Sequence, residues 1–301
     1  MVYTYDIDIR GEVVNLEIHT SSGVTEVEQR VLDHVAALRF SPATRDGQPV
    51  KVSLGPVVFT WILDIPRVMA PQFKSLYEQA WSHFKAQQYD AAAEVTRSLE
   101  QWPGRNAYEE VKYRILAASL ASRDLDDGAE QTHLNRIVDF QELADRNNFN
   151  NPYVVENQYL LMLDRIHSLQ LAKKLLGDAQ LTLNNLIARD RDAQITLSAQ
   201  KAQQEAQSRL LGIADVSLVG KLSALYPGAQ GLWETQLFRE KFLITNAAGT
   251  IASVHLSCKS GGDQRLIYPS AVSWKIPPGW QGCKLEIAGT SDTRFTLHQQ
   301  L

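Results

Sequence analysis

The chain has 301 residues, of which 44% are hydrophobic and 21% are charged, and its formal net charge is −4. These values are ordinary for a soluble globular protein, and the length is sufficient for two or three domains. The 30 basic and 34 acidic residues are interspersed, which excludes the basic surface typical of a protein that binds nucleic acid. No apolar run approaches the roughly 20 residues that a membrane-spanning helix needs, so we expect no membrane span in this chain.

The first 20 residues alternate between apolar and polar side chains. "VYTYDIDIR" and "GEVVNLEIHT" therefore predict two strands, with Gly11 at the turn between them. A signal peptide would begin with basic residues followed by a continuous apolar run. The chain as given is therefore interpreted either as a cytosolic protein or as the mature part of an exported one.

A helix and a closing strand are expected after these two strands. Apolar side chains recur every three or four residues within residues 26–38, among them Val27, Val31 and Val35, which places them on one face of a helix. "RDGQ" predicts a turn, and "PVKVSLGPVVFTWILD" predicts a strand or strand pair that is interrupted by its Gly-Pro pair. In the resulting β-β-α-β order, one helix covers one antiparallel sheet.

Residues 71–225 predict a domain built almost entirely of helices. "LYEQAWSHFKAQQYDAAAEVTRSLEQWP" has the pattern of two helices with a tight turn at residues 87–90. "EEVKYRILAASLASRDLDDGAEQTHLNRIVDF" repeats this design around a polar turn at residues 122–127, and a third hairpin is expected from Pro152. Residues 171–211 keep a helical pattern but become polar, which is typical of an exposed helix or one that packs on a partner.

Residues 230–301 predict a small antiparallel β domain, because short alternating runs are separated by the turn sequences "SGGD" and "PPGW". Cys258 and Cys283 both lie in strand-like segments of this region. An even number of cysteines confined to one small domain favours a disulfide in an oxidising compartment, and two buried free thiols are the alternative. Without a CxxC spacing, these cysteines do not predict a metal site.

Turn and aromatic residues follow one another in a specific order within residues 1–66. They are Ser22-Gly23, Phe40, Pro42-Ala43, Gly47, Pro49-Val50 and Val58-Phe59. In this order the region resembles the C-terminal domain of TonB-family energy transducers. An unrelated βα module that shares these turn residues is the alternative.

This resemblance implies a mode of binding and a location. Domains of the family capture a short extended peptide of an outer-membrane transporter by adding it as a strand to a sheet edge. By analogy the edge is the final strand, residues 57–62, on which Val57, Phe59 and Trp61 share one face. These three are the candidate partner-binding residues, although a core position for Phe59 or Trp61 is the alternative. The resemblance also implies a periplasmic protein.

The chain departs from the family pattern in one respect. Energy transducers carry an N-terminal membrane anchor and a long proline-rich spacer before this domain, whereas here the region that resembles it begins at residue 1. We therefore expect a periplasmic binding module rather than a complete transducer.

Small and aromatic residues recur in the helical region. They are Ala80-Trp81, Tyr89-Asp90, Ala92-Ala93 and Trp102-Pro103, followed more loosely by Tyr113, Leu116-Ala117 and Asp127-Gly128-Ala129. At these positions the region is similar to tetratricopeptide repeats. The similarity implies stacked hairpins whose curved surface binds peptides or partner domains, and a plain helical bundle is the alternative.

No pattern in the sequence predicts catalysis. The seven histidines are scattered and form no HExxH motif, and no serine lies in a nucleophile elbow. "DLDDG" lacks the spacing of a calcium loop and is interpreted as a turn between two helices. We therefore predict a protein that is not an enzyme and that has no cofactor.

The expected fold class is α+β multidomain, with a TonB-like β-β-α-β module (1–66), an all-α tetratricopeptide-like domain (71–225) and a small antiparallel β domain (230–301). The leading hypothesis is a periplasmic protein that binds a protein or peptide by strand addition and through its helical repeats, in TonB-dependent transduction or uptake, with an outer-membrane transporter as a candidate partner. A second hypothesis is a scaffold whose TonB-like module is vestigial and has a covered edge. A third is a glycan-binding β domain in which Trp274 and Trp280 form the stacking platform, with core positions for both as its alternative.

Overall fold

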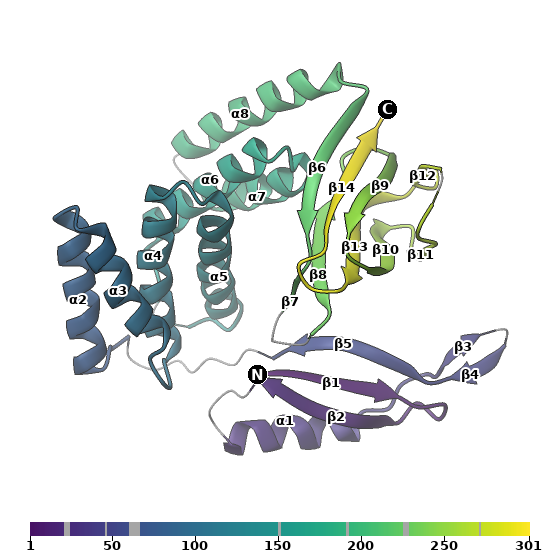
Figure 1. Ribbon diagram of the computed structural model, residues 1–301, viewed down its shortest axis with the longest axis horizontal. Helices are drawn as coiled ribbons and strands as arrows, with labels where there is room; N and C mark the ends of the chain where they lie inside the picture. Colours follow the sequence, from purple (N-terminus) through teal and green to yellow (C-terminus); the bar gives the residue numbers. More distant parts are fainter. Residues whose placement is uncertain are drawn as a thin grey trace.

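The computed structural model describes residues 1–20, 25–45, 47–59, 67–149, 152–190, 193–224, 229–270 and 272–301. The chain folds into an N-terminal sheet with one helix, a series of helical hairpins and a pair of antiparallel sheets (Figure 1). The predicted α+β fold class and the β-β-α-β order of the N-terminal module are confirmed.

The N-terminal module is a three-stranded antiparallel sheet with the strand order β2-β1-β5. Its strands are β1 (Val2–Ile7), β2 (Val13–Thr20) and β5 (Val52–Val58), and helix α1 (Thr25–Ala37) lies beside the sheet (Figure 1). Tyr3, Tyr5 and Val35 are buried in the core of the module. The rings of Tyr3 and Tyr5, both on β1, are stacked with centroids 6.2 Å apart, and Val35 of α1 shares their buried cluster.

Gly11 at the predicted turn is required by the close approach of two backbone segments. Its φ is +82°, and a Cβ atom there would lie 1.8 Å from the carbonyl oxygen of Phe40. The amide N–H of Phe40 donates to the carbonyl oxygen of Gly11 at 2.9 Å, which ties the chain after α1 to the turn between β1 and β2. A larger residue at this position would break that contact.

A short hairpin follows α1, where the sequence pattern predicted only a turn. Strands β3 (Ala43–Arg45) and β4 (Gln48–Val50) pair in antiparallel register, and Gly47 at the tip has a φ of +76°. Residues Ser22 and Gly23, which contribute to the TonB resemblance, lie outside the described residues.

In the described residues 67–149, 152–190 and 193–211, the middle of the chain forms three helical hairpins and one further helix. The helices are α2 (Pro71–Lys85), α3 (Tyr89–Glu100), α4 (Ala107–Arg123), α5 (Asp127–Arg146), α6 (Glu156–Ala172), α7 (Leu176–Arg189) and α8 (Gln194–Leu211). Two buried clusters hold them together, one around Phe73, Leu99 and Leu116 and the other around Tyr159 and Leu186. None of the helices in the described part of the chain has the length and hydropathy that a membrane crossing requires.

The same turn closes all three hairpins. In each turn one residue, Gln87, Leu125 or Lys174, has a φ near +60°. The next amide N–H donates back to the carbonyl five residues earlier at 2.8–2.9 Å, for example from Asp126 to Ala121, which is the 6→1 bond of a Schellman motif. In the second turn the Asp126 carboxylate also caps α5. The stretch "DLDDG" is therefore a turn between helices, as the sequence predicts.

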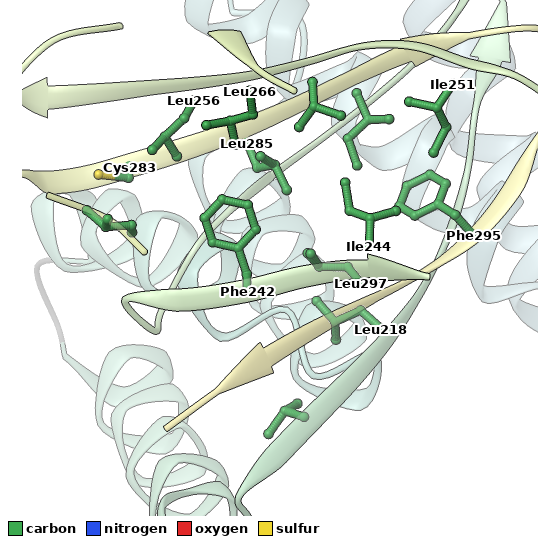
Figure 2. Close-up of a cluster of buried hydrophobic side chains, with 14 of the residues drawn as sticks. Leu218, Phe242, Ile244, Ile251, Leu256, Leu266, Cys283, Leu285, Phe295 and Leu297 are labelled. Atoms are coloured by element: carbon green, nitrogen blue, oxygen red, sulfur yellow. The ribbon is translucent and has the colours of Figure 1, made fainter. Parts of the chain in front are cut away.

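The C-terminal part is a sandwich of two antiparallel sheets with the strand orders β11-β10-β13-β8-β7 and β12-β9-β14-β6. The strands are β6 (Asp215–Lys221), β7 (Ser223–Ala224), β8 (Gly231–Gln236), β9 (Lys241–Ala248), β10 (Ile251–Ser260), β11 (Asp263–Leu266), β12 (Trp274–Lys275), β13 (Gln281–Gly289) and β14 (Arg294–Gln300). Side chains from both sheets meet between them (Figure 2), with Phe242 and Leu297 facing Leu256 and Leu285.

The sandwich begins earlier in the chain than the expected domain start at residue 230. Strand β6 follows α8 directly and pairs with β14 over its whole length. Its residues alternate between exposed and buried, and Val216 and Leu218 lie in the sandwich core. Residues 215–224, which were expected to belong to the helical domain, therefore pack with the sheets.

The predicted pairing of the two cysteines is present. Cys258 on β10 lies directly opposite Cys283 on β13, and the two form a disulfide. The amide of Cys258 donates to Gly262, and the carbonyl of Cys283 accepts from Leu237. The two cysteines therefore form no backbone hydrogen bond with each other and are a non-hydrogen-bonded pair of the ladder. In such pairs the side chains of the two facing residues come closest to each other.

Helix α7 docks on strand β8 through its first turn. The carboxylate of Asp178 accepts hydrogen bonds from the hydroxyl of Thr235 at 2.5 Å and from the amide of Gln236 at 3.1 Å. The preceding Gly177 allows this approach, because a Cβ atom there would lie 2.5 Å from the carbonyl oxygen of Gln236. Burial raises the pKa of Asp178, although these hydrogen bonds act in the opposite direction.

We predict that replacing both cysteines by serine lowers the free energy of unfolding by about 3 kcal/mol, because the disulfide restricts the unfolded chain across a separation of 25 residues. Urea denaturation followed by tryptophan fluorescence measures the change. Reduced wild-type protein should show the same loss. Equal stability of oxidised wild type and double variant would contradict the prediction.

We also predict that Asp178 makes stability depend on pH. Because its folded-state pKa is raised above the ordinary 3.8, the native state retains a proton that the unfolded chain releases, and stability falls as pH rises through the range above 3.8. Asp178→Asn should flatten this slope, whereas Asp263→Asn, at an exposed position, should leave it unchanged. Parallel slopes for Asp178→Asn and wild type, measured by urea denaturation at several pH values, would refute the assignment.

Candidate functional site

Among the residues that the structure describes, β5 forms one edge of the N-terminal sheet, and β2 forms the other. Strand β5 pairs with β1 on one side, and the strand order ends with it on the other. Met1 and Phe59 exchange two backbone hydrogen bonds, of 3.0 and 2.9 Å. Because hydrogen-bonded and non-hydrogen-bonded pairs alternate in an antiparallel ladder, the backbone N–H and C=O of the neighbouring Val58 point toward the open side.

A bulge interrupts β5 in its middle. The register with β1 shifts between Tyr3 and Tyr5, opposite the Gly55-Pro56 pair. Proline has no backbone N–H and is tolerated in sheets only at edges and bulges, so Pro56 is compatible with an outer strand. The bulge leaves the segment from Val57 to Phe59 as the last regular part of this edge in the described residues.

The structure places two of the three predicted partner-binding side chains. Val57 and Phe59 are partly buried and pack against the core of the module. Trp61 lies outside the described residues. Phe59 thus lies against the core, as its alternative interpretation expects, and a role of these side chains in binding stays a prediction.

A polar cluster around Asp6 lies at the other end of β5, near its first residue Val52. The ammonium of Lys51 lies 2.7 Å from the carboxylate of Asp6, and the amide of Asn15 donates to it at 2.6 Å. Hydrogen bonds from Lys51, Ser53 and Asn15 lower the pKa of Asp6 to about 2. This network joins β1 to residues of β2 and β5, whose register is set by the backbone ladder.

A groove of about 610 Å³ lies on the helical hairpins. Its walls come from the first helix of each hairpin, α2, α4 and α6, and from α5. The apolar side chains that line it are Trp81, Phe84, Ile115, Leu134, Leu161 and Met162. Leu161 is 53% exposed, so a large apolar side chain faces solvent inside a concave surface.

Trp81 and Phe84, which line the groove, belong to a row of aromatic rings that continues to Tyr89 outside it. The ring centroids of Trp81 and Phe84 are 5.3 Å apart, and those of Phe84 and Tyr89 are 5.6 Å apart, both edge to face. The guanidinium of Arg123 lies 4.2 Å from the ring of Tyr89 and ends the row. These contacts hold the rings in fixed orientations, so this part of the groove wall is largely preformed.

An ion pair spans the floor of the groove and joins the second hairpin to the third. Arg165 on α6 donates two hydrogen bonds, of 2.8 and 2.6 Å, to the carboxylate of Glu130 on α5. The Glu130 side chain is only 5% exposed, and that of Arg165 is 44% exposed. The planar, bidentate geometry fixes the position of α6 relative to α5.

The two tryptophans proposed as a stacking platform pack onto the sandwich. Both Trp274 and Trp280 are partly buried against the core cluster. The ring of Trp274 lies 5.5 Å from that of Phe242, one of the largest fully buried side chains. The alternative interpretation of these residues as packing residues therefore fits their positions better than a free platform does.

His298 is the centre of a polar cluster that sequence analysis did not identify. Its Nδ1 lies 3.0 Å from the Asp215 carboxylate and 3.1 Å from the Ser217 hydroxyl, and its Nε2 lies 2.8 Å from the Thr245 hydroxyl. An acid, an imidazole and a hydroxyl in line are also found in nucleophilic catalysis. Here the three strands β6, β14 and β9 bring these side chains together on the outer face of a sheet and outside the groove. Their hydrogen bonds therefore link the three strands.

Among the described residues, no group of three or more metal-ligating side chains is present.

The comparisons with known proteins identify the N-terminal region. Residues 1–62 match the family model described as Gram-negative bacterial TonB protein C-terminal. The chain therefore contains a TonB C-terminal domain, a non-catalytic type of domain, and the expected resemblance is confirmed for this region. No curated protein and no solved structure matches the chain. The similarity of the helices to tetratricopeptide repeats has no support from these comparisons and stays a prediction.

We predict that Arg165→Met lowers the free energy of unfolding by about 2 kcal/mol, because it leaves the buried Glu130 carboxylate without its partner, a penalty reduced here by the half-exposed arginine. The double variant Glu130→Leu/Arg165→Met should cost less than the single one. Urea denaturation of the four proteins of this double-mutant cycle measures both values. A double variant that is less stable than Arg165→Met would contradict this account.

Proposed function

We propose that this chain is a non-enzymatic protein of the Gram-negative periplasm that binds a partner protein by strand addition to β5. The observation that carries the proposal is the open edge of β5 within a domain that matches the TonB C-terminal family. An extended segment added there would pair with the outward-facing backbone groups of Val58. In the proposal this segment belongs to an outer-membrane transporter.

The backbone geometry supports this mode of binding. A partner strand needs unpaired N–H and C=O groups on a strand whose position is fixed. The mutual bonds of Met1 and Phe59 fix β5 against β1, and the packing of Val57 on the core prevents the strand from turning. The side chains of Val57 and Phe59 thus contribute by holding the edge in place.

The helical groove supplies a second proposed surface. Three hairpins with a common turn geometry support the similarity to tetratricopeptide repeats, and the groove across their first helices is concave and apolar. In the proposal it takes a further segment of the partner. Binding at two tethered sites would raise the overall affinity without new contacts at either one.

The disulfide supports the proposed compartment. Bonds between cysteines persist in oxidising environments such as the bacterial periplasm, and Cys258 and Cys283 are bonded to each other. A TonB C-terminal domain and a disulfide in one chain are both compatible with that location.

The proposal predicts where a partner cross-links. A photoreactive benzoylphenylalanine in place of the exposed Ser53 on β5 should capture an outer-membrane transporter from Gram-negative envelope extracts. The matched control is the same residue in place of the exposed Glu17 on β2, the opposite edge, which should capture none. Mass spectrometry of the cross-linked peptides identifies the partner and its segment.

A backbone variant tests the mechanism. Val58→Pro removes the outward N–H but spares the bonds between Met1 and Phe59, so the fold should persist. Capture through Ser53 should fall about fivefold or more, because one lost backbone hydrogen bond costs about 1 kcal/mol. Equal capture from both edges, or capture through Ser53 that is unaffected by Val58→Pro, would refute strand addition. Capture through groove positions alone would favour a scaffold with a vestigial TonB-like domain.

A further inference from the structure

A second hollow lies where the helices meet the sandwich, apart from both β5 and the groove. Its volume is about 540 Å³, within the range of roughly 300–1,000 Å³ that is typical of small-molecule sites. Helices α7 and α8 form one side of this cavity, and the connection from β8 to β9 forms the other. The apolar residues that line it include Leu176, Leu181, Leu210, Leu211, Leu237 and Phe238.

The exposure of the leucines changes with depth in this cavity. Leu176 and Leu210 are 5% and 9% exposed and belong to the core cluster, whereas Leu181 and Leu211 are 38% and 70% exposed. Leu176 and Leu210 therefore form a floor that is part of the hydrophobic core. Leu181 and Leu211 lie at the mouth of the cavity, where their apolar side chains are exposed to water. A ligand with an apolar chain would remove these side chains from water.

One cation lines the same cavity. The Nη1 of Arg239 donates to the carbonyl oxygens of Ala214 and Gln299, and its Nη2 donates to those of Leu210 and Ile213, at 2.7–3.2 Å. These four bonds hold the guanidinium at the end of α8 and leave its Nε–H as the remaining donor. Within the part of the chain that the structure describes, Arg239 has no carboxylate partner.

We infer that this cavity binds a single-chain amphiphile with an acidic head, of the chemical class of fatty acids. The aliphatic side chains would surround the hydrocarbon chain, and the carboxylate would lie at the mouth near Arg239. The four carbonyls neutralise the guanidinium only in part, because the end of a helix carries about half a negative charge. A partly buried cation without an anionic partner beside an apolar cavity is complementary to such a head group.

Titration calorimetry with dodecanoate, below its micelle concentration and on delipidated full-length protein, tests the inference. Dodecanoate should bind at one site per chain, dodecanol at least tenfold more weakly because it lacks the charge, and dodecyltrimethylammonium more weakly still. Equal affinity for the cationic and the acidic amphiphile would overturn the assignment of the head group to Arg239.

Two tryptophan variants locate the site. Leu181→Trp fills the mouth of the cavity from α7 and should weaken dodecanoate binding at least tenfold. Leu197→Trp is the matched control, because Leu197 is an exposed leucine on α8 about four turns from Leu210. Circular dichroism confirms that both variants are folded. Wild-type affinity in Leu181→Trp, equal loss in both variants, or no binding of dodecanoate to the wild type would overturn the proposal. Binding of a peptide with a C-terminal leucine, together with no binding of dodecanoate, would also overturn the proposal, because the cavity would then take a peptide and not a fatty acid.

Discussion

The backbone hydrogen bonds between Met1 and Phe59 are the constraint on which the proposed binding mode depends. They fix which groups of β5 face β1 and which face away, because the two kinds of pair alternate along an antiparallel ladder. The N–H and C=O of Val58 are thereby directed outward on a strand that α1 and the core of the module hold in place. A sheet edge is ordinarily shielded against pairing with other chains. In the proposed function, the edge formed by β5 in this TonB C-terminal domain is the surface to which a partner strand adds.

The remaining elements present further surfaces at fixed positions. The common turn of the three hairpins and the Glu130–Arg165 ion pair set the shape of the groove. Asp178 and Arg239 join the helices to the sandwich, the first through β8 and the second through the end of α8. The cavity at this junction lies beside Gly177, where α7 approaches β8 closely. One chain thus combines a sheet edge, a groove and a cavity, each formed by different elements.

Local patterns predicted much of the fold. Alternation and the turn at Gly11 indicated the first two strands, three- and four-residue spacing indicated the helices, and the two cysteines in strand-like segments indicated the disulfide. Strand β6 was missed because it follows a long polar helix and its alternation extends over only seven residues. Alternation also shows that Val57 and Phe59 share a face, but it does not show which face α1 covers. The similarity to tetratricopeptide repeats implied a concave helical surface, but the residues that line the groove could not be predicted, because they come from four helices that are far apart in the sequence.

The most direct test of the account is amide hydrogen exchange at two neighbouring residues of the full-length protein, measured by NMR. The N–H of Phe59, bonded to Met1, should exchange slowly, whereas that of Val58, directed to the open side, should exchange rapidly. Addition of the partner segment should then slow exchange at Val58 and leave Phe59 nearly unchanged. If Val58 in the free protein exchanges as slowly as Phe59, its N–H already has an acceptor, the edge is covered, and the account is contradicted.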